Sequence, residues 1–164
     1  NAPSKSKKGR LYISYNSVGY DVKFFLDGDE IGAFEGDYDS GSISIGYDYN
    51  IKKKIAIGSS LDIVYFKDEN MDEGNGFLNI YSKYFLPINS KVSLWGSAGY
   101  NVPLGEIEDH DGGLSYGFGL TMSNGIGVAY IVNTISEDSG EENGIGYWTV
   151  SNLNRVSVSY NFYF

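Results

Sequence analysis

Acidic side chains are the most numerous candidates for chemistry, and most of them are grouped in segments between residues 19 and 146. Carboxylate and amide oxygens are hard ligands that suit Ca²⁺ or Mg²⁺. Two of these groups supply candidate ligands for a divalent cation: Asp68, Asn70, Asp72, Glu108, Asp109 and Asp111. The segment from Asp68 departs from an EF-hand loop, because Glu73 replaces the sixth-position Gly and Asn79 the twelfth-position Glu. In the alternative interpretation, the acidic residues only keep exposed segments solvated.

The sequence gives little support for nucleophilic or acid–base catalysis. The single histidine, His110, lies between acids in Glu108-Asp-His110-Asp-Gly112, and Ser115 is five residues further on. Cysteine is absent, which excludes thiol catalysis and disulfides. We therefore expect a solvated histidine, no catalytic residues and no cofactor, apart from Ca²⁺ or Mg²⁺ at the acidic segments.

Five charged residues occur instead in the interior of segments in which polar and apolar residues alternate, away from the first and last residue of each segment: Arg10, Asp48, Asp62, Lys83 and Arg155. Successive side chains of a β-strand point to opposite faces, so alternation with period two predicts strands. Eight such segments are present, at residues 9–18, 41–51, 54–66, 77–86, 91–100, 114–122, 126–135 and 147–164. They predict an all-β protein in which eight strands form an antiparallel up-and-down barrel.

The two faces of the predicted strands differ in composition. One face is apolar and free of charge, as at Ile45 and Val158, whereas the other holds small residues, as at Ser44 and Ser159, and all five charged residues. A Lys or Arg facing lipid near the bilayer midplane costs ~2–4 kcal/mol. This distribution therefore predicts a transmembrane barrel with its apolar face toward lipid. A soluble barrel of lipocalin type, or a sandwich, would instead turn its apolar face inward.

The predicted connections alternate between short and long. Short ones are expected at 50–54, 87–90 and 123–125, and long acidic ones at 19–40, 67–76, 101–113 and 136–146. Transmembrane barrels have short periplasmic turns and longer extracellular loops. We therefore expect a basic periplasmic tail at residues 1–8, followed by a barrel at 9–164 with four extracellular acidic loops and periplasmic termini.

Composition agrees with a single domain of this kind. The chain has 164 residues and a net charge of −9, which argues against nucleic acid as a partner. It contains no apolar run of 18 residues that would form a transmembrane helix. The polar start, Asn1-Ala-Pro-Ser, is typical of a chain from which a signal peptide has been removed.

The last segment closes on Tyr160-Asn-Phe-Tyr-Phe164. Together with the eight alternating segments and the alternation of short and long connections, this ending makes the chain resemble the small eight-stranded outer-membrane barrels. These are the OmpA transmembrane domain, OmpX/Ail and the opacity-type proteins. The resemblance covers residues ~9–164. It implies that Tyr160, Phe162 and Phe164 form a C-terminal signal for the barrel-assembly machinery.

The resemblance also implies a place in a Gram-negative-type bacterial outer membrane and a role at the cell surface. We expect a non-enzymatic barrel that serves envelope structure or adhesion-type recognition, with a lumen filled by paired charges. Expected partners are outer-membrane lipid, lipopolysaccharide, the assembly machinery and an extracellular protein or cell-surface partner. A narrow channel for ions or small solutes, and a lipid-modifying outer-membrane enzyme, are the alternatives.

Overall fold

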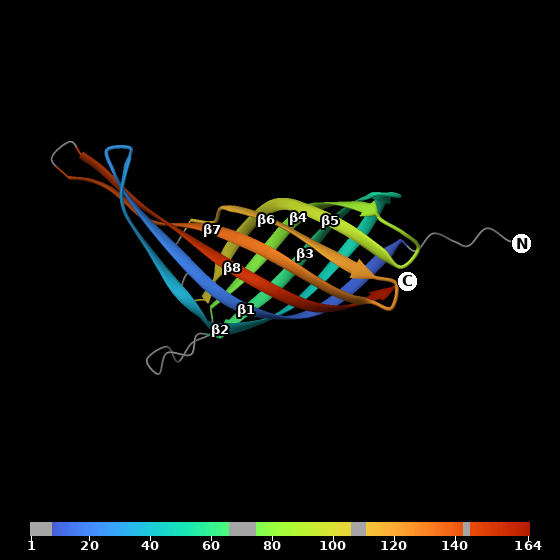
Figure 1. The fold of residues 1–164 in the computed structure, drawn as a ribbon. Helices are drawn as coiled ribbons and strands as arrows, with labels where there is room; N and C mark the ends of the chain where they lie inside the picture. Colours follow the sequence, from blue (N-terminus) through green and yellow to red (C-terminus); the bar gives the residue numbers. More distant parts are fainter. Residues whose placement is uncertain (1–7, 66–74, 106–110, 143–144) are drawn as a thin grey trace, which may run out of the picture.

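The computed structural model describes residues 8–65, 75–105, 111–142 and 145–164, which form a closed antiparallel β-barrel (Figure 1). Each strand pairs with the next in sequence, and β1 pairs with β8 to close the cylinder. The strands are β1 (Gly9–Leu26), β2 (Asp29–Lys52), β3 (Ile55–Tyr65), β4 (Asn75–Pro87), β5 (Val92–Leu104), β6 (Leu114–Met122), β7 (Ile126–Glu142) and β8 (Ile145–Tyr163). The predicted eight-stranded fold is confirmed. In these ranges no helix is long and apolar enough to cross a membrane, a criterion that does not apply to strands.

The apolar side chains of the strands lie on the outside of the barrel. In β2, Ile45 is 53% exposed, whereas the neighbouring Ser44 is 3% exposed. Ser44 pairs with Ser14 of β1 and with Asp62 of β3, so the polar residues of adjacent strands lie side by side in the lumen. In water this exterior would cost about 25 cal/mol per Å² of apolar surface, whereas hydrocarbon solvates it. The molecule is a transmembrane barrel, and the alternative of a soluble barrel with an apolar interior is wrong.

The connection predicted at 19–40 is a regular β-hairpin, so the prediction of a long loop there is wrong. β1 continues to Leu26 and β2 begins at Asp29, which leaves only Asp27 and Gly28 in the turn. Both turn residues have positive φ, 49° and 97°. Two positive φ values define a type I′ turn, for which Asp-Gly is a preferred sequence. The alternation of polar and apolar residues is interrupted in this region, because the pairing of β1 with β2 shifts register just after Val18.

Four strands continue beyond the closed part of the barrel. Among the described residues, β2 pairs with β3 only from Gly41 onward, and β7 pairs with β6 only as far as Asn133. Further out, β2, β1, β8 and β7 stay paired in that order and form an open sheet, called here the projecting sheet (residues 20–36, 134–142 and 145–153). The connection predicted at 136–146 is accordingly reduced to the two residues between β7 and β8. Figure 1 shows the sheet leaving the barrel at the end opposite to the start of β1 and the end of β8.

The outward face of the strands becomes polar where the projecting sheet begins. In β8, the exposed Val156 and Val158 are followed on the same face by Asn154 and Asn152. The amides of Asn152 and Asn154 donate hydrogen bonds of 2.8 and 2.7 Å to the two carboxylate oxygens of Asp21 in β1. Such a network has no place in hydrocarbon, where a charged carboxylate is expensive. The change from valine to asparagine along the outward face therefore marks the edge of the lipid-facing band.

Candidate functional site: the barrel lumen and its closures

Asp48 of β2 is the centre of the first buried charge cluster in the lumen. Arg10, its cross-strand partner in β1, donates from Nε at 2.8 Å and also from a terminal guanidinium nitrogen. The Nζ of Lys83 lies 3.2 Å from Oδ2, and the Tyr81 hydroxyl donates to Oδ1 at 2.8 Å. All four side chains are buried. Because two cations share one carboxylate, the cluster holds one positive charge in excess.

Aromatic rings and a glycine shape the space around Lys83. Its Nζ lies 4.4 Å from the ring centre of Trp95 and 4.7 Å from that of Tyr81. These distances are within the range of cation–π attraction. Tyr81 reaches Asp48 across Gly58 of the intervening strand β3, where a Cβ would lie 2.6 Å from the Tyr81 ring. Glycine at position 58 therefore leaves the room that this contact requires.

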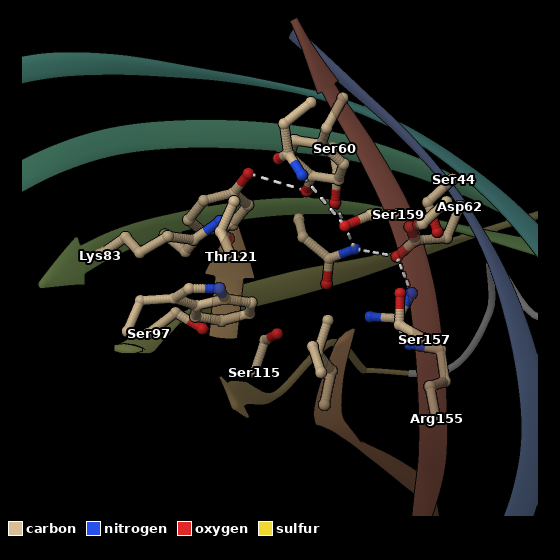
Figure 2. A pocket seen from close by; sticks show the side chains of 18 of the residues that line it. Ser44, Ser60, Asp62, Lys83, Ser97, Ser115, Thr121, Arg155, Ser157 and Ser159 are labelled. Atoms are coloured by element: carbon tan, nitrogen blue, oxygen red, sulfur yellow. Dashed lines mark hydrogen bonds and ion pairs between the residues drawn. The ribbon is translucent and has the colours of Figure 1, made fainter. Parts of the chain in front are cut away.

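Asp62 of β3 is the centre of the second cluster. Its Oδ2 lies 2.5 Å from a terminal nitrogen of Arg155, and it also accepts a hydrogen bond from the Asn79 amide. The other terminal nitrogen of Arg155 donates to Oδ1 of Asn133 at 3.2 Å. Figure 2 shows Lys83 and Arg155 on opposite sides of the cavity, with serine side chains between them. One cation and one carboxylate make this cluster formally neutral.

Little free space remains in the lumen. The central cavity has a free volume of about 40 Å³, which is enough for only a few water molecules. Toward the projecting sheet, the lumen is closed by a buried apolar cluster of Val18, Phe77, Ile135 and Leu153. Charged residues thus fill the middle of the lumen and apolar residues close one end, so the described lumen is plugged.

No family model and no curated protein matches this sequence. Solved structures do match. A de novo designed transmembrane β-barrel aligns with a TM-score of 0.52 and 10% identity, over 97% of this chain and 98% of the design. Neisserial surface protein A aligns with a TM-score of 0.50 and 13% identity, over 93% and 97%. Ail of Yersinia pestis, solved in a phospholipid bilayer nanodisc, aligns with a TM-score of 0.47 and 15% identity, over 96% and 100%.

The chain has the fold of the small eight-stranded outer-membrane barrels. At identities of 10% and 13% the likeness to the designed barrel and to Neisserial surface protein A concerns the fold alone. It agrees with the closed antiparallel cylinder and with the apolar exterior, both of which follow from this structure by itself.

The five charged residues that the alternation places inside the barrel are all buried there. The structure divides them between two clusters. Arg10 and Lys83 meet Asp48, whereas Arg155 meets Asp62. The uncharged partners of these residues were missed in the sequence, although they share the same face of the strands. Asparagine is depleted in strands, so its recurrence on this face was a usable signal: Asn16, Asn79, Asn101 and Asn133 are all buried.

Most of the predicted cation ligands lie outside the described residues, as do His110 and residues 1–7 of the predicted N-terminal tail. Asp111 is described and exposed. Within the described ranges, no group of three or more His, Asp or Glu side chains is arranged to hold a metal ion. Ser115 is buried in the lumen, where its hydroxyl donates to Asn133 at 2.9 Å.

The three aromatic residues of the predicted C-terminal signal are exposed on the outside of the barrel, at the end that carries the short turns. The rings of Tyr160 and Phe162 are 4.9 Å apart in an edge-to-face arrangement. Phe164 stacks on Tyr47 of β2 at 6.0 Å. These contacts join the last strand to the apolar belt around the barrel.

Proposed function

We propose that this protein is a non-enzymatic outer-membrane barrel whose lumen is plugged and whose projecting sheet acts in recognition outside the cell. The observation that carries the proposal is the continuation of four paired strands beyond the lipid-facing band. A plugged lumen offers no route for solutes. A regular sheet that stands clear of the membrane provides a stable surface for a partner.

The orientation follows from the connection lengths. The short turns, the start of β1 and the end of β8 lie at one end, and the projecting sheet lies at the other (Figure 1). Transmembrane barrels of bacteria carry short turns on the periplasmic side and longer segments outside. In our proposal residues 1–8 are therefore a periplasmic tail, and the sheet extends from a Gram-negative-type cell.

The β1–β2 hairpin of the projecting sheet suits a partner that combines basic and apolar groups. Asp29, Glu30 and Ile31 are exposed beside its turn, and Phe34 and Glu35 are exposed nearer the barrel. A protein on another cell or in the extracellular medium can present both kinds of group. Nucleic acids and other polyanions would be repelled by the acidic residues.

Divalent cations are a second part of the proposed surface chemistry. Ca²⁺ or Mg²⁺ bound by the acidic segments would bridge them to the phosphates of lipopolysaccharide, which would otherwise repel them. Isothermal calorimetry of the detergent-solubilised protein tests this idea directly. Binding heat is expected with Ca²⁺. The absence of heat at millimolar Ca²⁺ would show that the acidic segments do not bind the cation.

The β1–β2 hairpin can be tested by substitution. Bacteria displaying the protein are measured for adherence to cultured eukaryotic cells and to immobilised extracellular-matrix proteins. We expect adherence that is lost when Glu30→Gln, Ile31→Ser, Phe34→Ser and Glu35→Gln are combined. Replacing Lys52, Lys53 and Lys54 by Gln at the opposite end serves as the control and should have no effect. Adherence that survives the four hairpin substitutions, or that is absent from the unaltered protein, would contradict the proposal.

The channel alternative is tested by planar-bilayer recording. Solute passage would require both charge clusters to rearrange, because they occupy the middle of the lumen. We therefore expect no steady single-channel conductance, and a reproducible conductance would overturn the plug. The enzyme alternative predicts lipopolysaccharide of altered mass in cells that express the protein, whereas our proposal predicts an unchanged mass spectrum.

A further inference from the structure

At the end of the barrel with the short turns, the lumen opens into a second cavity of about 230 Å³, called here the vestibule. Three cationic side chains line it, those of Arg10, Lys53 and Lys91, and the serines at positions 90 and 123 add hydroxyl groups. Its lining contains no Asp or Glu side chain. We propose that the vestibule binds a phosphate group, carried either by a small solute or by the headgroup of a phospholipid.

The charge balance of the lumen favours an anion at this position. Arg10 lines both the vestibule and the central cavity, so it connects the two. Behind it, Arg10 and Lys83 share the single carboxylate of Asp48, which leaves one positive charge in excess. A charge buried in a protein is stabilised by a counter-charge. An anion held in the vestibule would supply that counter-charge from the open side.

The cations converge on the vestibule from three separate parts of the chain. Arg10 belongs to β1, Lys53 to the turn between β2 and β3, and Lys91 to the turn between β4 and β5. Lys53 and Lys91 are exposed, and within the part of the chain that the structure describes neither side chain has an ion-pair partner. Both ammonium groups are therefore available to a ligand.

The mixture of donors matches phosphate better than it matches a carboxylate. Each ammonium group has three N–H donors and each serine hydroxyl has one. Phosphate presents several acceptor oxygens in a tetrahedral arrangement, and charge-assisted hydrogen bonds to such oxygens are the strong ones. A carboxylate has only two oxygens in one plane and would leave some of these donors unused.

The test is a titration of the full chain, folded in dodecyl maltoside micelles that contain no phosphate, with inorganic phosphate at constant ionic strength. NMR shifts of the Ser90 and Ser123 amides report binding. We expect saturable binding that weakens by about tenfold or more in the Lys53→Gln/Lys91→Gln variant. The control variant, Lys52→Gln/Lys54→Gln, loses the same charge from residues that do not line the vestibule. It should weaken binding by less than about twofold.

A second arm identifies the source of the phosphate. The titration is repeated with phosphatidylglycerol added to the micelles. If the apparent affinity for inorganic phosphate falls more in the unaltered protein than in the Lys53/Lys91 variant, a headgroup occupies the vestibule. An equal change in the two proteins indicates a soluble ligand. Both results support the phosphate site. Shifts that do not saturate in micelles free of phospholipid, or equal weakening in the two variants, would overturn it.

Discussion

Asp48 is shared by two buried cations, so one substitution at this residue changes the charge balance of the lumen. In Asp48→Asn, Arg10 and Lys83 remain buried without a counter-charge. Breaking a buried ion pair from one side typically costs ~3–5 kcal/mol. We expect a fall of that size in the free energy of unfolding, measured by urea titration of the protein folded into lipid vesicles.

The control for Asp48 is an ion pair in solvent. Glu30 pairs with Lys23 at 3.2 Å in the projecting sheet, and the two side chains are 44% and 43% exposed. Exposed pairs contribute ~0–1 kcal/mol. Glu30→Gln should therefore change the stability by less than ~1 kcal/mol, and equal losses for the two variants would contradict the buried cluster.

Gly58 gives a second prediction for a single residue. Gly58→Ala introduces a methyl group 2.6 Å from the Tyr81 ring, so the ring must move away from Asp48. Overpacking of this kind costs ~1–3 kcal/mol. Gly96→Ala is the matched control, because its Cβ would meet only the carbonyl oxygen of residue 117, at 3.9 Å. The same urea titration should separate the variants, and identical midpoints would show that the lumen has room at position 58.

Among the elements of the fold, the β1–β2 hairpin depends on its two-residue turn. Gly28 has a φ of 97°, a conformation that a β-branched residue rarely adopts. Gly28→Val should increase amide exchange at Phe24 and Glu30 in the hairpin while leaving Ile45 in the barrel unchanged. Asp27→Asn keeps the preferred turn chemistry and should exchange like the unaltered protein. Hydrogen exchange followed by NMR measures both, and protection that is unchanged in Gly28→Val would contradict the turn assignment.

The strand centres could be predicted from the sequence because lipid imposes a strict condition on them. A charge on the outward face is costly. An apolar residue such as Ile45 can therefore be assigned to the lipid-facing side, and a polar neighbour such as Ser44 to the lumen. The projecting sheet escapes this condition, since both of its faces are outside the lipid-facing band. There the alternation no longer distinguishes strand from loop, and the Asp27-Gly28 dipeptide was the one local signal for the hairpin.

The sequence alone also could not predict which of the lumen charges form ion pairs. The alternation puts Arg10, Lys83, Arg155, Asp48 and Asp62 on one face without saying which cation meets which carboxylate. That depends on register, which the structure fixes by pairing Arg10 with Asp48 across β1 and β2. Register depends on turn length and on bulges, and both were uncertain in the sequence.

For the molecule as a whole, assembly in the cell can be separated from stability in the bilayer. Phe164 is 64% exposed on the last strand, and Phe118 is 66% exposed on β6. If Phe164 belongs to an assembly signal, Phe164→Ala should reduce the amount of folded barrel in the outer membrane, whereas Phe118→Ala should not. In vesicles, where no assembly machinery acts, the two variants should have similar unfolding free energies.

Heat-modifiable gel migration of membrane fractions measures the folded amount in that experiment. Both variants remove a lipid-facing ring of the same kind, so the transfer of apolar surface is matched. Equal amounts of folded protein in cells would contradict a role of Phe164 in assembly.

The central claim is that the barrel turns its apolar face to hydrocarbon and encloses its polar face. NMR of the protein in lipid nanodiscs tests it through nuclear Overhauser contacts between side chains and lipid acyl chains. We expect acyl-chain contacts for Ile45, Leu61 and Val158, and none for Ser44 or Ser60. Acyl-chain contacts from the two serines, with the three aliphatic side chains silent, would contradict it.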